Sequence, residues 1–468
     1  MIQQMAERAK EKSPKRVSIL KLLRDYPEFK PHTYANSVID LFCGAGGLSE
    51  GFRQAGFEVV AGTDNDPDAL ATFALNFPEA TPILGDIRTS TIRERVRAAA
   101  RGATVIVGGP PCQAFSQVRN HTRVIDDPRN SLYREFVETV RDSLPSAFLV
   151  ENVTGIDQMG VREQIASDLS IEGEYEVVSQ IVDAADFGVP QTRKRLLFIG
   201  VRRGFGLSPP VLTGSGVTDS MVLARFTGDR KPRYQLVTQQ NLLSIHLAEA
   251  LEDCDDLTAV TAHDAISDLA VLEVGNRRDE MGWEELPAPT SAYQRLMRAK
   301  CGSHIFNVQV PRINKDTELR LQAIPQGGNH RDLDEPYLKR YLTGHRWGQA
   351  NGTGKLSRKH FYAYRRLHPK LWAWTLNTKS DCVYHYDVTR ALSVREFARL
   401  QSFPDRFVFT TDRQRGSLEG RHDGGPAHSR YRQVGNAVPP LLAKRAAELL
   451  MVELNAVRER ETAKANVG

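Results

Sequence analysis

The sequence predicts an α/β fold, in which a doubly wound, mostly parallel sheet carries a smaller inserted domain. Apolar stretches of strand length recur from residue 38 to about residue 201, and helix-like stretches separate them. Several of these apolar stretches lead to a glycine or an acidic residue, the residue types found where an open α/β sheet binds its ligand. With 468 residues and 41% hydrophobic content, the chain can bury a large core and form about two domains.

The first expected strand, residues 38–42, runs into a glycine-rich turn, and a helix-like stretch follows at residues 49–55. The turn contains Gly44, Gly46 and Gly47 and is typical of nucleotide-binding loops. No Lys-Ser or Lys-Thr follows the glycines, and their spacing is not Gly-x-Gly-x-x-Gly, which argues against a phosphate-loop enzyme. Cys43, within the turn, is interpreted as a small buried side chain.

The next two expected strands, residues 58–62 and 81–84, lead to Asp64 and Asp86. In a doubly wound fold, an acidic side chain in the position of Asp64 accepts the hydroxyl groups of a ribose. Helix capping explains either aspartate alone, but it explains a pair at successive strand ends less well. The sequence therefore favours a nucleotide-like ligand at this edge of the sheet.

A fourth expected strand, residues 103–107, is followed by the sequence Gly-Gly-Pro-Pro-Cys at residues 108–112. The two prolines stiffen this turn, and the two glycines let a ligand approach the backbone closely. The thiol of Cys112 is thus held as a nucleophile would be. A buried structural cysteine is the better interpretation of an isolated Pro-Cys pair, but the other motifs of the chain favour the nucleophile.

Charged side chains accompany two further expected strands. Residues 147–150 lead to Glu151, a carboxylate at a carboxyl strand end, where open α/β sheets place their chemistry. Arg193 and Arg195 precede the strand expected at residues 196–200. Alternating arginines suit a strand edge that faces an anion or the polar edge of a base, and a solvated basic turn is the alternative.

With these motifs, the chain resembles the DNA cytosine-5 methyltransferases of the bacterial restriction-modification type. The matching segments follow the order of that family and cover residues 40–52, 63–66, 108–116, 151–153, 191–195, 390–404 and 435–440. Residues 202–389 match only in outline, and this is where the family has its variable target-recognition part. The resemblance implies a Rossmann-like fold that binds S-adenosyl-L-methionine.

The resemblance also implies the chemistry of the site. Carbon-5 of cytosine is a poor nucleophile, so Cys112 would attack carbon-6 of a flipped-out base, and carbon-5 would then take the methyl group. Glu151 would contact the base, while Arg193 and Arg195 would favour the thiolate. S-adenosyl-L-homocysteine would be the cofactor product. The implied cofactor-binding residues are Phe42, Gly44, Gly46, Gly47, Asp64, Asn65, Asp86, Leu132, Asn436 and Val438. An ordinary core position is the alternative for Leu132.

A basic segment, residues 336–380, contains ten Lys or Arg residues and no Asp or Glu, and aromatic residues are interleaved with them. This composition is typical of a nucleic-acid-binding face. A solvated basic surface over an aromatic core is the alternative. The candidate DNA-binding residues are Arg346, Arg358, Lys359, Arg365 and Arg366.

These motifs predict the order of the domains. We expect an N-terminal extension (1–37), a catalytic and cofactor-binding domain (38–201), a target-recognition domain (202–389), a connecting motif (390–434) and a C-terminal segment that rejoins the catalytic domain (435–468). In the connecting motif, Ser393 and Glu396 predict a capping box at the start of a helix whose arginines are structural. A helix is expected from residue 440 to about residue 458.

Composition limits the partners. A net charge of +5 permits an anionic partner without requiring one, and five cysteines without metal-ligand spacing argue for a reducing compartment and no metal. The sequence has no apolar run of membrane length and no signal peptide, so we expect a cytoplasmic monomer that acts on double-stranded DNA. A restriction endonuclease could act on the same site without forming a stable complex.

Two other functions remain open. One is cytosine-5 methylation of RNA, against which the large recognition insertion argues. The other is a non-catalytic DNA-binding protein on the same fold, against which the intact glycine loop, Cys112 and Glu151 argue.

Overall fold

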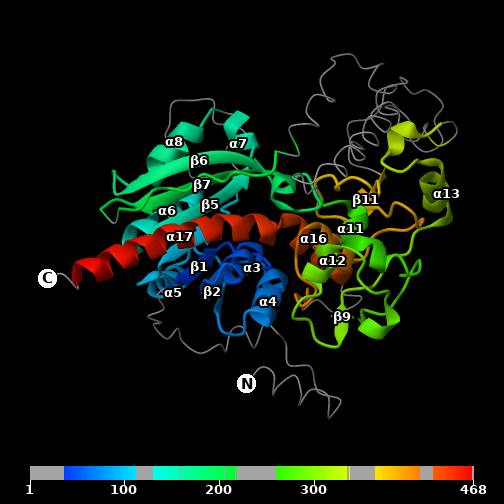
Figure 1. The fold of residues 1–468 in the computed structure, drawn as a ribbon, viewed down its shortest axis with the longest axis horizontal. Coiled ribbons are helices and arrows are strands. Elements are labelled where there is room, and N and C mark those ends of the chain that lie inside the picture. Colours follow the sequence, from blue (N-terminus) through cyan, green and yellow to red (C-terminus); the bar gives the residue numbers. More distant parts are fainter. Residues whose placement is uncertain are drawn as a thin grey trace, which may run out of the picture.

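The molecule consists of an α/β lobe and a second lobe with little regular secondary structure beside it (Figure 1). The computed structural model describes residues 36–111, 130–158, 160–204, 206–216, 218, 260–334, 337, 364–411 and 425–465. In Figure 1 the first lobe runs from blue to green and includes the long red helix α17 (Pro440–Ala465). The carboxyl-terminal helix therefore lies in the same lobe as the first strands.

A seven-stranded sheet in the order β3-β2-β1-β4-β5-β7-β6 forms the centre of the α/β lobe. Its strands are β1 (Ser37–Leu41), β2 (Glu58–Asp64), β3 (Thr81–Leu84), β4 (Val105–Gly108), β5 (Ala147–Val153), β6 (Tyr175–Asp183) and β7 (Lys194–Arg202). Only β7 pairs in antiparallel fashion, with β5 and β6, among the strand pairs of this sheet. The predicted doubly wound, mostly parallel sheet is confirmed.

Strand β6 was not predicted from the sequence. This strand lies at the edge of the sheet, and its middle residues are half-exposed. It therefore lacks the continuous apolar run by which the buried strands were predicted. The connections around it are the helices α7 (Gly155–Gln158) and α8 (Arg162–Leu169) and the 3-10 helix η4 (Ala184–Phe187).

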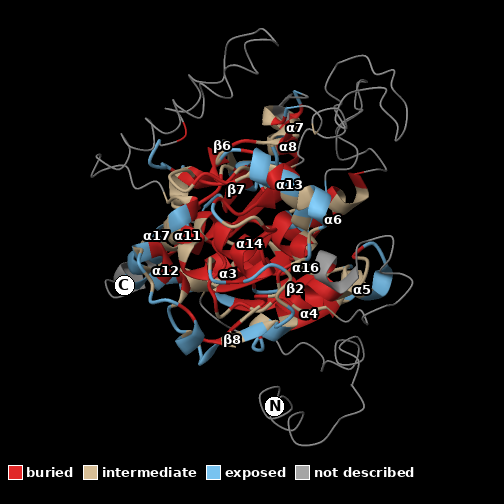
Figure 2. Ribbon diagram, turned by 90° about the vertical axis from the view of Figure 1, so that its right-hand side faces the viewer, coloured by how far each residue is buried: buried red, intermediate tan, exposed pale blue. Residues whose placement is uncertain are grey.

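Helices cover both faces of the sheet because successive strand residues point to opposite faces. In β5, Leu149 packs into one hydrophobic core, whereas Phe148 and Val150 pack into the other. The first core is shared with α3 (Gly47–Gln54), α4 (Pro67–Asn76) and α17, and the second with α5 (Ser90–Ala100), α6 (Ser131–Ser143) and α8. Figure 2 shows this buried centre in red, with intermediate and exposed residues around it.

Helix α17 packs closely against α3. A Cβ atom on Gly51 would lie 2.4 Å from the Cβ of Ala443, so the helices can approach this closely only because residue 51 is glycine. Residues of α17 and α3 thus share one hydrophobic core. The helix ends at Ala465 rather than near residue 458. The expected end was too early because this stretch is highly charged, and charged residues with good helix propensity can continue a helix.

The second lobe has a smaller hydrophobic core of its own, formed by Leu269, Leu272, Leu286, Ile305, Val308 and Val310. Its elements are α11 (Ala262–Ile266), η5 (Ser267–Leu269), β8 (Glu280–Gly282), η6 (Trp283–Glu285), α12 (Ala292–Met297), β9 (His304–Phe306), α13 (Lys315–Ala323), η7 (His330–Asp332), β10 (Arg365–Arg366), η10 (Ser380–Cys382) and β11 (Val383–Tyr384). Helices α14 (Val394–Leu400) and α16 (Gly425–Asn436) join it to the first lobe. The domain boundaries given above remain a prediction.

Helix α14 begins with the predicted capping box. The Ser393 side chain accepts a hydrogen bond from the backbone N–H of Glu396, and the Glu396 side chain accepts one from the backbone N–H of Ser393. Glu396 also pairs with Arg390 at 2.8 Å, and both side chains are fully buried. The arginines of this motif thus lie in the interior, where each needs an internal partner.

Arg399 of α14 forms a buried network of ion pairs. It donates three hydrogen bonds to Asp405, at 2.9, 3.2 and 2.8 Å, and one to Asp268, near the start of the second lobe, at 2.5 Å. Burial lowers the pKa of Arg399, but the two carboxylates outweigh burial and raise it above its ordinary value. Arg399 therefore stays charged in the core.

We expect Arg399→Met to lower the free energy of unfolding by about 3–5 kcal/mol, because two buried carboxylates lose their shared cation. Urea denaturation followed by circular dichroism measures this change. Arg278→Met is the control, since Arg278 pairs with Glu285 at the surface, and it should change the midpoint little. Equal midpoint shifts in the two variants would contradict a special role for the buried network.

Candidate active site

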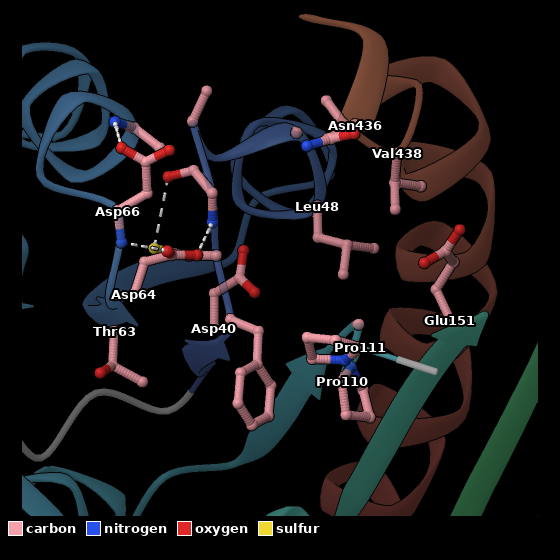
Figure 3. Close-up of a pocket in the computed structure, with 18 of the residues that line it drawn as sticks. Asp40, Leu48, Thr63, Asp64, Asp66, Pro110, Pro111, Glu151, Asn436 and Val438 are labelled. Atoms are coloured by element: carbon pink, nitrogen blue, oxygen red, sulfur yellow. Dashed lines mark hydrogen bonds between the residues drawn. The ribbon is translucent and has the colours of Figure 1, made fainter. Parts of the chain in front are cut away.

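A pocket of about 600 Å³ lies where the order of the sheet reverses. From β1 the chain proceeds outward to β2 and β3 and then crosses to β4 and β5 on the other side. The loops after β1 and β4 therefore lead in opposite directions and leave a crevice between them, the usual ligand site of such sheets. Residues at the carboxyl ends of β1, β2, β4 and β5 line the pocket, together with residues from the end of α16 (Figure 3).

The glycine loop after β1 forms one wall. Phe42, Gly44 and Gly47 line the pocket, and Phe42 and Gly44 have positive φ angles of 63° and 53°. Gly46 does not line it: a Cβ atom there would lie 2.6 Å from the ring of Phe77, so this glycine lets the loop pack on the core. Cys43 is buried, and burial raises the pKa of its thiol well above the ordinary value, as suits a core residue.

Acidic side chains form the next wall. Asp64 accepts hydrogen bonds from the backbone N–H groups of Gly44 and Asp66, each at 2.8 Å (Figure 3). Burial raises the pKa of Asp64, and these N–H groups partly oppose that shift. Asp86 also lines the pocket and pairs with Arg88, whose hydrogen bonds lower the pKa of the Asp86 carboxyl. Asp64 thus holds the glycine loop in place as well as facing the pocket.

The remaining predicted cofactor-binding residues come from three separate segments. Asn65 follows Asp64, Leu132 lies in the first turn of α6, and Asn436 and Val438 come from the C-terminal segment. All of them line the pocket. The fold therefore gathers every predicted cofactor-binding residue except Gly46 around one cavity.

Glu151 lies at the end of the pocket where β4 and β5 finish (Figure 3). Its carboxylate forms an ion pair with Arg195, and both side chains are mostly buried. A Cβ atom on Gly109 would lie 3.0 Å from Oε2 of Glu151, so the glycine leaves room for the carboxylate. The side chain of Asn152 donates a hydrogen bond to the carbonyl of Pro110 at 3.1 Å and ties the Pro-Pro turn to β5.

The sequence places Cys112 immediately after this turn, but Cys112 lies outside the residues that the structure describes. Arg193 lines the pocket and is buried, and its guanidinium donates hydrogen bonds to the carbonyls of Leu376, at 3.2 Å, and Gly435, at 2.6 Å. Burial lowers the pKa of Arg193 well below its usual range. Its contacts hold backbone segments together, and its predicted catalytic role remains a prediction.

Of the candidate DNA-binding residues, Arg365 and Arg366 lie within the part of the chain that the structure describes. Arg346, Arg358 and Lys359 lie outside the described residues. Arg365 lies over the ring of Trp374 with its Cζ atom 5.5 Å from the ring centroid. Arg366 donates hydrogen bonds to the carbonyls of Tyr386 and Ile324, and burial lowers its pKa. The contacts of Arg366 are thus internal, and the DNA-binding roles of all five residues remain predictions.

The described part of the chain contains neither a candidate metal site nor a membrane-spanning helix. Within the ranges given above, no group of His, Cys, Asp and Glu side chains could hold a metal ion. Among the helices so described, none is long and apolar enough to cross a membrane.

Arg432 and Asp40 are among the pocket residues that the sequence reasoning missed. Arg432 of α16 pairs with Asp66 at 2.7 Å, and no local pattern could have revealed a contact between such distant segments. Asp40 lies within β1 and is fully buried. Its Oδ2 atom accepts hydrogen bonds from Ser49, whereas Oδ1 has no hydrogen-bond partner among the described residues. A carboxylate inside an apolar strand was the available signal for Asp40.

We expect Asp40→Asn to change how stability depends on pH. Burial raises the pKa of Asp40 from 3.8 to about 7 in the folded state, with nearby Asp64 contributing. Between these two values the unfolded chain has released the proton that the folded protein still holds, so wild-type stability falls as the pH rises. The melting temperature of the variant relative to wild type should therefore increase from pH 5 to pH 8. A constant difference would contradict the raised pKa.

The comparisons with known proteins agree on one family. The family model for C-5 cytosine-specific DNA methylase matches residues 36–451. Type II methyltransferase M.AgeI of Thalassovita gelatinovora is 31% identical over 465 residues, covering 89% of this chain and 100% of the relative. Type II methyltransferase M.DdeI of Desulfomicrobium norvegicum is 32% identical over 422 residues, covering 88% of each chain.

A solved structure supports the fold. The crystal structure of a proposed DNA modification methyltransferase encoded within an E. coli prophage is similar to this chain with a TM-score of 0.60 and 24% identity, covering 90% of this chain and 99% of that one. The family match along most of the sequence and the two type II relatives lead to one conclusion: the chain belongs to the C-5 cytosine-specific DNA methylases, as an enzyme of the restriction-modification type whose family uses S-adenosyl-L-methionine.

Proposed function

We propose that the protein methylates carbon-5 of cytosine within one specific sequence of double-stranded DNA, through a covalent adduct between Cys112 and carbon-6 of a flipped-out base. The observation that carries this proposal is the convergence of Glu151, Arg195 and the Pro110–Pro111 turn on one pocket. Cys112 follows that turn directly in the chain. A nucleophile, a carboxylate and a cofactor pocket would thus share one site.

The chemistry requires each of these groups. Attack by the Cys112 thiolate forms a bond to carbon-6 and gives carbon-5 the electron density that it needs to accept a methyl group. Loss of the proton from carbon-5 then returns electrons to the ring, breaks the bond from sulfur to carbon-6 and restores aromaticity. Glu151 would contact N3 and the exocyclic amine and favour protonation at N3 as the thiolate adds. Its ion pair with Arg195 would keep the carboxylate in one orientation.

The pocket fits S-adenosyl-L-methionine by the character of its side chains. Asp40 is a buried and Asp64 a half-buried carboxylate on the walls, and one oxygen of Asp40 has no hydrogen-bond partner among the described residues. Such groups suit a ligand with an ammonium group, a sulfonium group and ribose hydroxyls. The bound cofactor supplies an electrophilic methyl group. Phe42, Asp86 and Leu132 would border the adenosine, and Asn436 and Val438 would close the pocket from the C-terminal side.

The face of the ring at carbon-6 is stacked inside a duplex, so the target base has to leave the helix. Unstacking costs a few kcal/mol, which contacts with the phosphates and base edges would offset. We assign these contacts to the basic segment, residues 336–380. Arg346, Arg358, Lys359 and Arg365 are better candidates than Arg366, whose guanidinium donates to backbone carbonyls.

The enzyme would act as a monomer on host DNA in the bacterial cytoplasm. Its methyl groups would protect the host from a restriction endonuclease that cuts the same sequence, with no stable complex between the two. The names of the type II relatives support this role.

We expect Cys112→Ser to abolish methyl transfer while S-adenosylhomocysteine and DNA still bind. Bisulfite sequencing of a plasmid from cells expressing the wild-type protein would identify the target site. A duplex with 5-fluorocytosine at that site should trap wild type covalently, because fluorine cannot leave as a proton does, and the serine variant should not be trapped. Methylation by the variant at the wild-type rate would rule out the nucleophile.

We expect Gly109→Ala to slow methyl transfer, because the added Cβ would press on Glu151. The single-turnover rate should fall toward that of Glu151→Gln, for which losing a positioned acid predicts a decrease of about 100-fold. Gly155→Ala is the matched control, since no atom lies within 4 Å of its added Cβ. An unchanged rate for Gly109→Ala would show that Glu151 does not need this space.

A further inference from the structure

Two buried glutamines outside the pocket connect segments that are far apart in the sequence. Gln191 lies in the turn before β7, and Gln401 is the C-cap residue of α14. Both side chains are fully buried, and neither residue lines the pocket. A buried amide is stable only when its donors and acceptors are used, so the partners of these two side chains decide what they do.

The two side chains form one directed chain of hydrogen bonds. The backbone N–H of Leu376 donates to Oε1 of Gln191 at 2.7 Å, and Nε2 of Gln191 donates to Oε1 of Gln401. Nε2 of Gln401 then donates to the carbonyl of Ala437 at 2.5 Å. Because one end is an N–H that can only donate and the other a carbonyl that can only accept, both amides must point the same way.

The end at Ala437 lies in the wall of the cofactor pocket. Ala437 lines the pocket, and so do its neighbours Asn436 and Val438, which are labelled in Figure 3. The carbonyl of Ala437 accepts its hydrogen bond from Gln401, which does not line the pocket. This hydrogen bond fixes the backbone between Asn436 and Val438, two candidate cofactor-binding residues.

The other end lies in the basic segment, residues 336–380. Residues 373–376 of this segment run alongside the turn that contains Gln191: the N–H of Ala373 donates to the carbonyl of Pro190, and the N–H of Thr192 donates to the carbonyl of Ala373, both at 2.9 Å. Arg193 binds the carbonyl of Leu376. The end of the basic segment is thus attached firmly to the turn before β7.

We propose that Gln191 and Gln401 are positioning residues that couple the cofactor pocket to the basic segment. They touch neither ligand, but they fix the peptide at Ala437 to the backbone of Leu376 through a continuous chain of hydrogen bonds. Breaking the chain leaves a partly buried carbonyl without its donor, and the 436–438 backbone then shifts to find another. The inference rests on the proposed cofactor and DNA-binding roles of these two regions.

Isothermal titration with S-adenosylhomocysteine tests the proposal on the intact protein. Gln191→Met and Gln401→Met should each raise the dissociation constant on the order of tenfold, the usual size for a residue that acts through a network. The double variant should bind no more weakly than the weaker single variant, because both changes interrupt the same chain. If the two side chains acted independently, the double variant would instead raise the dissociation constant by the product of the two single increases.

Gln294→Met is the matched control. Gln294 is also a fully buried glutamine, but its hydrogen bonds, to Thr290 and Ser267, lie within the second lobe. Its replacement should lower the melting temperature and leave the dissociation constant unchanged. The proposal is overturned if both chain variants fold and bind as wild type does, or if Gln294→Met weakens binding as much. Failure of wild type to bind S-adenosylhomocysteine would instead refute the proposed cofactor.

A measurement on the wild-type protein tests the coupling even if the variants do not fold. Hydrogen–deuterium exchange reports the amide of Leu376, which lies outside the pocket at the far end of the chain. Saturation with S-adenosylhomocysteine should slow exchange in the peptide that contains Leu376 and leave peptides around Gln294 unchanged. Unaltered exchange at Leu376 with the pocket saturated would exclude the coupling.

Discussion

The close approach of the C-terminal segment to helix α3 is the contact on which the pocket depends. A Cβ atom on Gly47 would lie 2.3 Å from the carbonyl of Val438, and one on Gly51 would lie 2.4 Å from Ala443. Only glycine at these two positions lets the end of the chain reach the first βα unit. Without this contact, the pocket would lose the wall that contains Asn436 and Val438, although the sheet itself would remain complete.

Polar contacts align the returning segment once the glycines have made room for it. Ser429 and Gln433 of α16 bind Asp68 and Thr72 of α4 at 2.6 Å each, and Arg432 pairs with Asp66 at the start of the same helix. These contacts lie one turn apart along both helices, so they fix the register in which α16 meets α4. The connection from Asp64, the last residue of β2, through Asn65 to α4 is thereby fixed relative to α16.

Much of the fold and of the pocket could be predicted from the sequence because their signals are local. Each of the first five strands is an apolar run, and a parallel sheet brings the carboxyl ends of its strands to one edge. Asp64, Asp86 and Glu151 could therefore be placed at that edge from the sequence. Strand β6 was missed because an edge strand is only half-buried. Gln401 and Arg432 were missed as partners because hydrogen bonds between distant segments leave no periodic pattern.

The closing contact joins segments that are made at different times during synthesis of the chain. The glycine loop is among the first described segments to leave the ribosome, whereas residues 438–443 are among the last. Contacts between such distant segments form late in folding, after the local βα units have begun to assemble. A nascent chain can therefore contain the whole sheet and still lack one wall of the pocket. The packing of residues 438–443 against α3 can form only after these residues have been translated.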